Sequence, residues 1–316
     1  MQQTMKRIIY CAFALFFLVL TDSALAQSFT FRVLANKGEN KIKKSSGQVL
    51  PLRTGATLMA GDQLIAIEGA YIGLMHNSGR TIEVRSAGTM NVADLERRVN
   101  TGSSSVTERY AAHLNNKMDE EQSGTYRSRL AATGAVSRAV ADGTLSLFLE
   151  NSDGSAKFLD DNAVIRWESP KDSATYIVTV TNLMDQVLLQ VETNETSVAL
   201  DFNEQLQDDL GYGTFIIKVA DRDDESIASN QDGIAIKRIM DNPELVEELE
   251  NLKGEIATDT PLGKLILASF YEENGLLLDA LTQYEAAIEM APDVPDFQEL
   301  YDNFLYVNGF IELEEE

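Results

Sequence analysis

The stretch 275–292, GLLLDALTQYEAAIEMAP, constrains the fold more than any other, because its apolar residues recur at helical spacing. One helix face collects its apolar and small side chains, which are Leu277, Ala280, Leu281, Tyr284, Ala287 and Ile288. Pro292 ends that helix. A second apolar helix starts at Thr260-Pro261, and Glu273-Asn274-Gly275 supplies the turn between the two. The sequence therefore predicts a helical hairpin.

The pattern of small and large residues in this hairpin resembles a tetratricopeptide repeat over one 34-residue unit, Pro261 to Val294. The matching positions are Leu267, Ala268, Tyr271, Gly275, Ala280, Tyr284, Ala287 and Pro292. Lys264 departs from the repeat, which usually has an aromatic residue there, and this indicates a solvated or terminal repeat. The resemblance implies a protein-binding module, with Lys264, Tyr271 and Asn274 as candidate contacts to a partner. The alternative is that these three residues only pack or solvate the module.

Two further helical patterns flank the hairpin. One begins at Asn242-Pro243, where the asparagine is expected to cap the helix and the proline to occupy its first turn. The other places five apolar residues on one face, namely Phe297, Leu300, Tyr301, Phe304 and Leu305. We therefore expect a tetratricopeptide-like helical module over 241–316, closed by a capping helix.

The first 26 residues have the features of a secretory signal. Lys6 and Arg7 precede an apolar run over 8–20, and Ala24-Leu25-Ala26 precedes Gln27 in the pattern of a cleavage site. The run is shorter than an ordinary membrane span, and a retained N-terminal anchor is the alternative. Cys11 is the only cysteine of the chain and lies inside this run, so the mature chain is expected to form no disulfide. These features favour a periplasmic or secreted protein of a bacterial cell envelope.

Short β-prone runs separated by glycine turns follow the signal and predict a β-rich domain over 27–100. Within it, the run from Leu52 to Val84 resembles the FecR domain. The matching features are Gly55, Leu58, the Gly61-Asp62 turn, a strand over 70–74, the Ser78-Gly79 turn and a return strand over 82–84. The resemblance implies an extracytoplasmic module. Founding members of the family pass an outer-membrane signal to a sigma factor through a cytoplasmic segment, which is not recognisable in this sequence.

The next segment, 101–141, is predicted as a helical linker. A helix from Val106 onward would place Ala111, Leu114 and Met118 on one face. The basic residues Arg127, Arg129 and Arg138 are interpreted as a solvated face, with an internal docking strip as the alternative.

A second β-rich domain is predicted over 142–240. Seven runs rich in β-branched and aromatic residues span 144–149, 163–167, 176–180, 187–191, 196–200, 214–219 and 233–239. Their order, with the single tryptophan Trp167 early in the series, resembles an immunoglobulin-like or fibronectin type III sandwich. Trp167 is expected to be a core residue of that sandwich.

The charge distribution and the lack of recognisable catalytic motifs narrow the functions expected of this chain. Residues 27–140 carry 15 basic and 10 acidic side chains, whereas 141–316 carry 9 basic and 39 acidic ones, a balance that disfavours nucleic acid as a partner. His76 and His113, the only histidines, fall in different predicted domains, and no hydrolase, metalloprotease or nucleotide-binding motif is present. The acidic run 221–225 could bind calcium, but it lacks the glycine and distal glutamate of an EF-hand, so a solvated loop is preferred.

The sequence therefore predicts a multidomain α+β protein with no catalytic site, cofactor or metal. The expected function is binding or scaffolding through contacts with an envelope protein. Two alternatives stay open: an extracytoplasmic regulator of the FecR signalling type, and a module that binds peptidoglycan or another carbohydrate.

Overall fold

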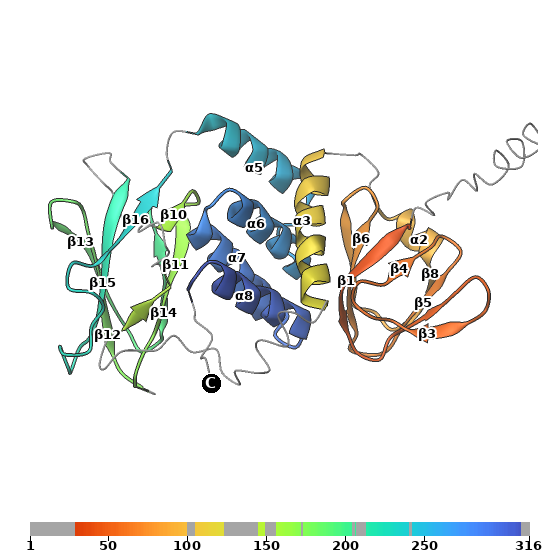
Figure 1. Ribbon diagram of the computed structural model, residues 1–316, viewed down its shortest axis with the longest axis horizontal. Coiled ribbons are helices and arrows are strands. Elements are labelled where there is room, and N and C mark those ends of the chain that lie inside the picture. Colours follow the sequence, from red (N-terminus) through yellow and green to blue (C-terminus); the bar gives the residue numbers. More distant parts are fainter. Residues whose placement is uncertain are drawn as a thin grey trace, which may run out of the picture.

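The computed structural model describes residues 29–99, 105–122, 145–148, 156–171, 173–203, 206, 213–239 and 242–310 (Figure 1). Over these residues the chain is a mixed α+β protein, which confirms the class expected from the sequence. The expected signal segment 1–26 and the cluster of Arg127, Arg129 and Arg138 lie outside the described residues. No helix in the described part of the chain is long and apolar enough to cross a membrane.

The N-terminal β region (29–99) contains two four-stranded sheets that share one apolar core. The first has the order β4-β1-β6-β7 and consists of β4 (Thr57–Leu58), β1 (Phe31–Lys37), β6 (Tyr71–His76) and β7 (Thr81–Val84). The second has the order β3-β2-β5-β8 and consists of β3 (Val49–Pro51), β2 (Lys41–Lys43), β5 (Gln63–Ala66) and β8 (Gly88–Asn91). The short helix α2 (Val92–Glu96) follows. Every residue of β6 is buried, because this strand has packed neighbours on both of its faces.

The helix predicted from Val106 onward is present as α3 (Ser105–Gln122), but it does more than link two domains. Tyr110, Ala111 and Leu114 on its apolar face have no exposed surface. They belong to the same core as the C-terminal helices, since α3 packs against α5 (Pro243–Glu255), α6 (Pro261–Glu273) and α8 (Pro295–Val307). The segment predicted as a linker therefore contributes a structural helix to the C-terminal module.

The middle β region (146–238) has two sheets that face each other across one core containing Trp167, as expected for that residue. Five strands form the order β10-β16-β15-β12-β13, from β10 (Ala156–Phe158), β16 (Ile234–Arg238), β15 (Thr214–Asp221), β12 (Tyr176–Thr181) and β13 (Val187–Thr193). Three form the order β14-β11-β9, from β14 (Ser197–Asp201), β11 (Asn162–Glu168) and β9 (Ser146–Leu147). Each of the seven predicted runs contains a strand. Strand β10, which pairs in parallel with β16, was not predicted from the sequence.

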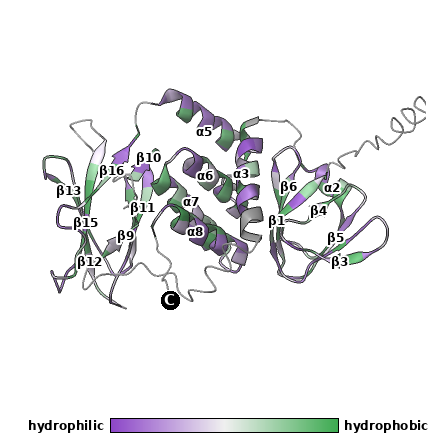
Figure 2. Cartoon of the chain, viewed as in Figure 1, coloured by the Kyte–Doolittle hydropathy of each residue, from purple (hydrophilic) through white to green (hydrophobic). Residues whose placement is uncertain are grey.

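The four C-terminal helices, which include α7 (Leu277–Met290), begin and end close to the predicted residues. The side chain of Asn242 accepts a hydrogen bond from the Leu245 amide at the start of α5, and Thr260 does the same for Gly263 at the start of α6. Gly275, with φ of 69°, makes the turn between α6 and α7. Polar residues dominate the exposed side of α5 (Figure 2), whereas α6 is apolar and buried along most of its length. We call α3 together with α5–α8 the helical block.

The helical block lies between the two β regions, although most of it comes last in the sequence (Figure 1). On the N-terminal side, Tyr71 of β6 packs edge-on against Phe297 of α8, with 5.5 Å between ring centroids. The Glu83 carboxylate of β7 accepts hydrogen bonds from the Tyr71 hydroxyl at 2.7 Å and from the Leu262 amide at 3.1 Å. On the other side, Leu278 of α7 enters the core of the middle β region. The three parts thus share packed interfaces.

Candidate functional site

The structure places the three residues predicted to contact a partner at different depths. Lys264 is partly exposed on α6, whereas Tyr271 is fully buried and its hydroxyl donates a hydrogen bond to Asp160 at 2.5 Å. Asn274 ends α6, where its side-chain amide donates to the Phe270 carbonyl at 2.8 Å and to the Tyr110 hydroxyl at 3.2 Å. In this arrangement Tyr271 offers no atom to a partner. The binding role assigned to the three residues stays a prediction.

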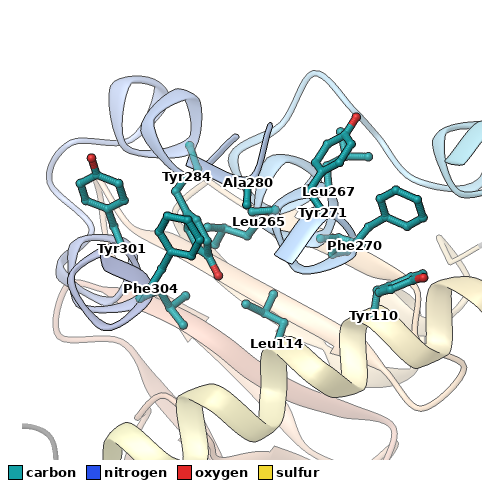
Figure 3. Packing of buried hydrophobic residues seen from close by; sticks show 14 of the residues in the cluster. Tyr110, Leu114, Leu265, Leu267, Phe270, Tyr271, Ala280, Tyr284, Tyr301 and Phe304 are labelled. Carbon is teal, nitrogen blue, oxygen red and sulfur yellow. The ribbon is translucent and has the colours of Figure 1, made fainter. Parts of the chain in front are cut away.

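Helix α3 packs against the side of α6 that carries Phe270 and Asn274. Tyr110 and Leu114 of α3 point toward α6 and α8 (Figure 3), and the ring of Tyr110 lies edge-on to that of Phe270, with 5.1 Å between centroids. Arg109, beside Tyr110, forms ion pairs with Glu248 of α5 and Glu273 of α6. A partner would have to displace this helix to reach the buried side of α6.

A groove of about 1020 Å³ lies elsewhere, between the outer face of the β14-β11-β9 sheet and helices α7 and α8. Its lining is mixed in polarity and comprises Phe148, Val164, Arg166, Trp167, Glu168, Ser169, Thr196, Ser197, Val198, Ala199, Thr282, Glu285, Ala286, Ile288, Glu289, Gln298 and Tyr301. Interfaces between structural units are common places for ligand sites, and this volume is at the upper end of the usual range. We take this groove as the candidate functional site.

The groove is crossed by an ion pair between the sheet and α7. Arg166 of β11 donates to both carboxylate oxygens of Glu285, from Nη2 to Oε2 at 3.0 Å and from Nε to Oε1. Tyr301 of α8 donates its hydroxyl to the same Oε1 at 2.7 Å. Glu285 therefore joins three elements through hydrogen bonds, two of them in the fork geometry that a guanidinium favours.

This network fixes the protonation of Arg166 and Tyr301. Burial by itself lowers the pKa of Arg166, but the hydrogen bonds and charge of Glu285 outweigh it, so the net pKa is raised. Burial and the charge of Glu285, together with their hydrogen bond, raise the pKa of Tyr301 well above its ordinary value. At neutral pH the groove thus presents a charged guanidinium and a neutral phenol, both hydrogen-bonded to Glu285.

The floor of the groove is held in place where β9 ends. Beyond β9, the backbone amide of Val164 on β11 donates to the Thr282 hydroxyl of α7 at 3.1 Å, and that hydroxyl donates to the Leu278 carbonyl at 2.8 Å. One turn earlier, both oxygens of the buried Asp279 accept backbone amide hydrogen bonds, from Leu159 at 2.6 Å and from Asp160 at 3.1 Å. Beyond the end of β9, a side chain of α7 therefore accepts the β11 backbone hydrogen bond that a neighbouring strand would otherwise accept.

The acidic run 221–225 was a candidate calcium site, and several of its carboxylates form ion pairs with Lys171 and Arg222. Asp221 is buried and pairs with Lys171 at 2.6 Å, and its carboxylate accepts from the Asp223 amide at 2.8 Å. Arg222 pairs with Glu192 at 2.7 Å and with Asp223 at 3.1 Å. Among the residues that the structure describes, no group of three or more potential metal ligands comes together.

The two histidines and the single tryptophan lie on three different elements, β6, α3 and β11. His76 is buried edge-on against Phe31, with its Nδ1 2.7 Å from the Ser78 hydroxyl, and His113 lies on the separate helix α3. Trp167 is 1 % exposed and packs edge-on against Tyr176. Its buried ring therefore offers no platform for stacking a sugar.

Sequence reasoning missed the groove because its residues carry only a weak local signal. Arg166 lies between the core residues Ile165 and Trp167, so the alternation of β11 predicts that it faces outward, but not what it faces. Glu285 likewise lies outside the apolar face of α7. Their pairing depends on two segments 119 positions apart coming together.

The chain matches no protein-family model and no curated protein. Inferences about its function therefore rest on its residues and their geometry.

Proposed function

We propose that this chain is a non-catalytic binding protein of a bacterial cell envelope, acting through contacts with another protein. In this proposal the signal is cleaved after Ala26, and the mature chain works in the periplasm or outside the cell. The N-terminal β region would be a FecR-type module, the middle β region an immunoglobulin-like sandwich, and the helical block a module of the tetratricopeptide type. Each assignment rests on the sequence resemblances given above.

The observation that carries the proposal is the groove between β11, β14, α7 and α8. Two of its lining residues are joined by a hydrogen bond from the Val164 backbone amide to the Thr282 hydroxyl, so its shape is set by the fold before a partner binds. Apolar side chains such as Val164, Ala286 and Ile288 lie beside polar ones such as Ser197 and Gln298 in its lining. A mixed lining of this kind suits a polypeptide, which presents both backbone polar groups and apolar side chains.

The electrostatics of the groove also favour binding over catalysis. General acid–base chemistry works best with a group whose pKa lies near the operating pH. The pKa values of Arg166 and Tyr301 are both raised above ordinary values that are already high, and Glu285 is committed to hydrogen bonds with both. These three groups are suited to fixing the walls of the groove and to recognising a ligand.

Site-specific crosslinking tests the proposal. A photoreactive amino acid replaces Glu289, which lies on α7 at the groove, and a matched chain carries it at Glu247 on the exposed side of α5. We expect a crosslinked partner protein in the native cell from position 289 and not from position 247. Adding Ala286→Trp to fill the groove should abolish the crosslink.

The thermal unfolding temperature of the Ala286→Trp chain serves as the control for folding, because Ala286 is only partly buried. Equal crosslinking from both positions, or crosslinking that survives groove filling in a folded chain, would contradict the proposal. In that case another surface of the protein contacts the partner.

A further inference from the structure

Strand β14 forms one wall of the groove and is also the edge of its sheet. It pairs with β11 on one side, in the register Arg166 with Ser197 and Val164 with Ala199. In the described part of the chain, no strand pairs with its other side. An unpaired edge carries a row of backbone donors and acceptors that a further strand can use.

The hydrogen bonds around β14 show which of its backbone groups face the open side. The Trp167 amide donates to the Thr196 carbonyl at 3.0 Å, and the Phe202 amide donates to the Asp161 carbonyl at 2.7 Å. Because bonded and non-bonded pairs alternate in an antiparallel ladder, residues 196, 198, 200 and 202 are bonded to β11. The amides and carbonyls of Ser197 and Ala199 therefore point away from β11, toward the open edge.

The side chains at these positions leave space beside the edge. Arg166 and Val164 are directed to the outer face of the sheet, since Ile165 and Trp167 are buried in the core on the inner face. Opposite residues share a face, so the small Ser197 and Ala199 also border the groove. Tyr301 and Gln298 of α8 form the far wall.

The charge along the groove indicates what kind of strand would fit. Arg166 is already neutralised by Glu285. Glu289 is exposed at the groove and, among the described residues, forms no ion pair. The chain beyond residue 140 carries 39 acidic against 9 basic residues, so a basic segment would be attracted and an acidic one repelled.

We propose that the groove takes an extended, basic segment of a partner protein, which adds to the open edge of β14 as a further strand. This inference rests on the proposed function and specifies its ligand. The backbone of the segment pairs with Ser197 and Ala199, alternate side chains enter the groove toward Tyr301, and a lysine or arginine faces Glu289. Backbone pairing supplies affinity, and the groove and its charge supply selectivity.

The test uses the full chain and a fluorescein-labelled peptide, Thr-Lys-Val-Lys-Val-Thr, in an anisotropy titration. We expect saturable binding with a dissociation constant below about 1 mM. Binding should be lost when every peptide amide is methylated, or when both lysines are replaced by glutamate. Hydrogen exchange of the Ser197 and Ala199 amides should slow on binding, whereas those of residues already bonded to β11 should change little.

Two substitutions separate the backbone and charge contributions. Ala199→Pro removes an amide that only an incoming strand would use, and proline is tolerated where a strand amide faces outward, so binding should weaken about tenfold in a folded chain. Glu289→Gln should weaken binding about three- to fivefold, and Glu247→Gln on α5 should leave it unchanged.

Failure of this inference is distinguishable from failure of the proposed function. If the peptide binds equally well after Ala199→Pro and full amide methylation, but Ala286→Trp abolishes binding, the groove binds ligands without strand addition. If a partner crosslinks at position 289 in the cell but the peptide does not bind at about 1 mM, the basic-strand ligand is wrong and the groove function stands. Concentration-dependent dimerisation that Ala199→Pro removes would identify a second copy as the occupant, against this proposal.

Discussion

Asp279 has no exposed surface and lies where the middle β region meets the helical block. Its carboxylate accepts the amides of Leu159 and Asp160, while the Asp160 side chain accepts from Tyr271 and pairs with Lys253 at 3.3 Å. Two carboxylates thus share one interface with a single lysine among these contacts. Tyr271, which the sequence predicted as a contact to a partner, is buried and donates its hydroxyl hydrogen bond within this internal network.

Asp279 should make the stability of the protein depend on pH. Burial and the charge of Asp160 raise its pKa well above the ordinary value of 3.8, against the opposing effects of the two amides and Lys253. In the folded protein the carboxyl therefore holds its proton to a higher pH than in the unfolded chain. Its contribution to stability is full below about pH 4 and is lost as the pH rises toward the folded pKa, by at most about 1.4 kcal/mol per pH unit.

Asp279→Asn should flatten this part of the pH profile, because the variant has no proton to lose. The free energy of unfolding in urea, measured at steps between pH 4 and pH 8, checks it. Asp185→Asn, at an exposed turn residue with φ of 58°, is the control and should leave the profile unchanged. A wild-type profile that Asp279→Asn does not alter would show that this carboxyl is not the origin of the pH dependence.

At the scale of elements, helix α3 shows what a sequence can and cannot reveal. The spacing of Ala111 and Leu114 predicted the helix, and both are buried as that spacing requires. What they pack against is not encoded locally, since the partner α6 lies about 150 positions further along the chain. The same holds for the groove, whose walls come from β11, β14, α7 and α8.

Strand β10 was missed for a different reason. It contains only Ala156, Lys157 and Phe158, which is too short for alternation to be distinguished from chance. It becomes a strand because it pairs with β16, where Ala156 lies opposite Ile236, and because Phe158 packs into the core. The seven longer runs have the β-branched residues and flanking turns that made them visible.

The turn at Gly79 should be sensitive to substitution because it lies against α3. Gly79 has φ of +80°, and a Cβ there would lie 2.4 Å from the Glu108 Cα. Gly69 has a similar φ of +73° with nothing within 4 Å of its Cβ position, so it provides a matched control. We expect Gly69→Ala to cost about 1 kcal/mol from backbone strain alone, and Gly79→Ala about 3 kcal/mol because the helix must also move.

Urea unfolding of the two variants measures these costs, and limited proteolysis reports whether the α3 segment becomes easier to cleave in Gly79→Ala. If the two glycine variants lose the same stability and α3 stays protected in both, the packing of this turn against α3 contributes nothing.

At the scale of the whole molecule, the helical block holds the two β regions together. Its apolar core extends into the first sheet through Leu34, Ala35, Tyr71 and Met75. Backbone groups also join the parts, since the Asn36 amide donates to Asp296 at 3.3 Å and Arg80 donates to the Glu255 carbonyl at 3.2 Å. Each β region has an apolar core of its own, and each also shares apolar contacts with the helical block.

A chain shortened to end at Ile239 should expose the apolar surface that the helices cover. Tyr71 and Met75 are at most 7 % exposed in the full protein and share one core with the C-terminal helices, as do Tyr110 and Leu114 on α3, so all four would lose packed neighbours. We expect the shortened chain to bind a hydrophobic dye strongly and to unfold at a lower temperature than the full chain. A shortened chain that bound no dye and kept the original unfolding temperature would show that the β regions are independent.

The order of the parts in space differs from their order in the sequence, and this affects how the protein is made. A ribosome synthesises the N-terminal β region, α3 and the middle β region before residues 261–310, which fill the space between them. Until those last helices emerge, the nascent chain carries two uncovered apolar faces at once. The fold can therefore be completed only after residues 261–310 have been made, and chaperones have their main opportunity to bind before then.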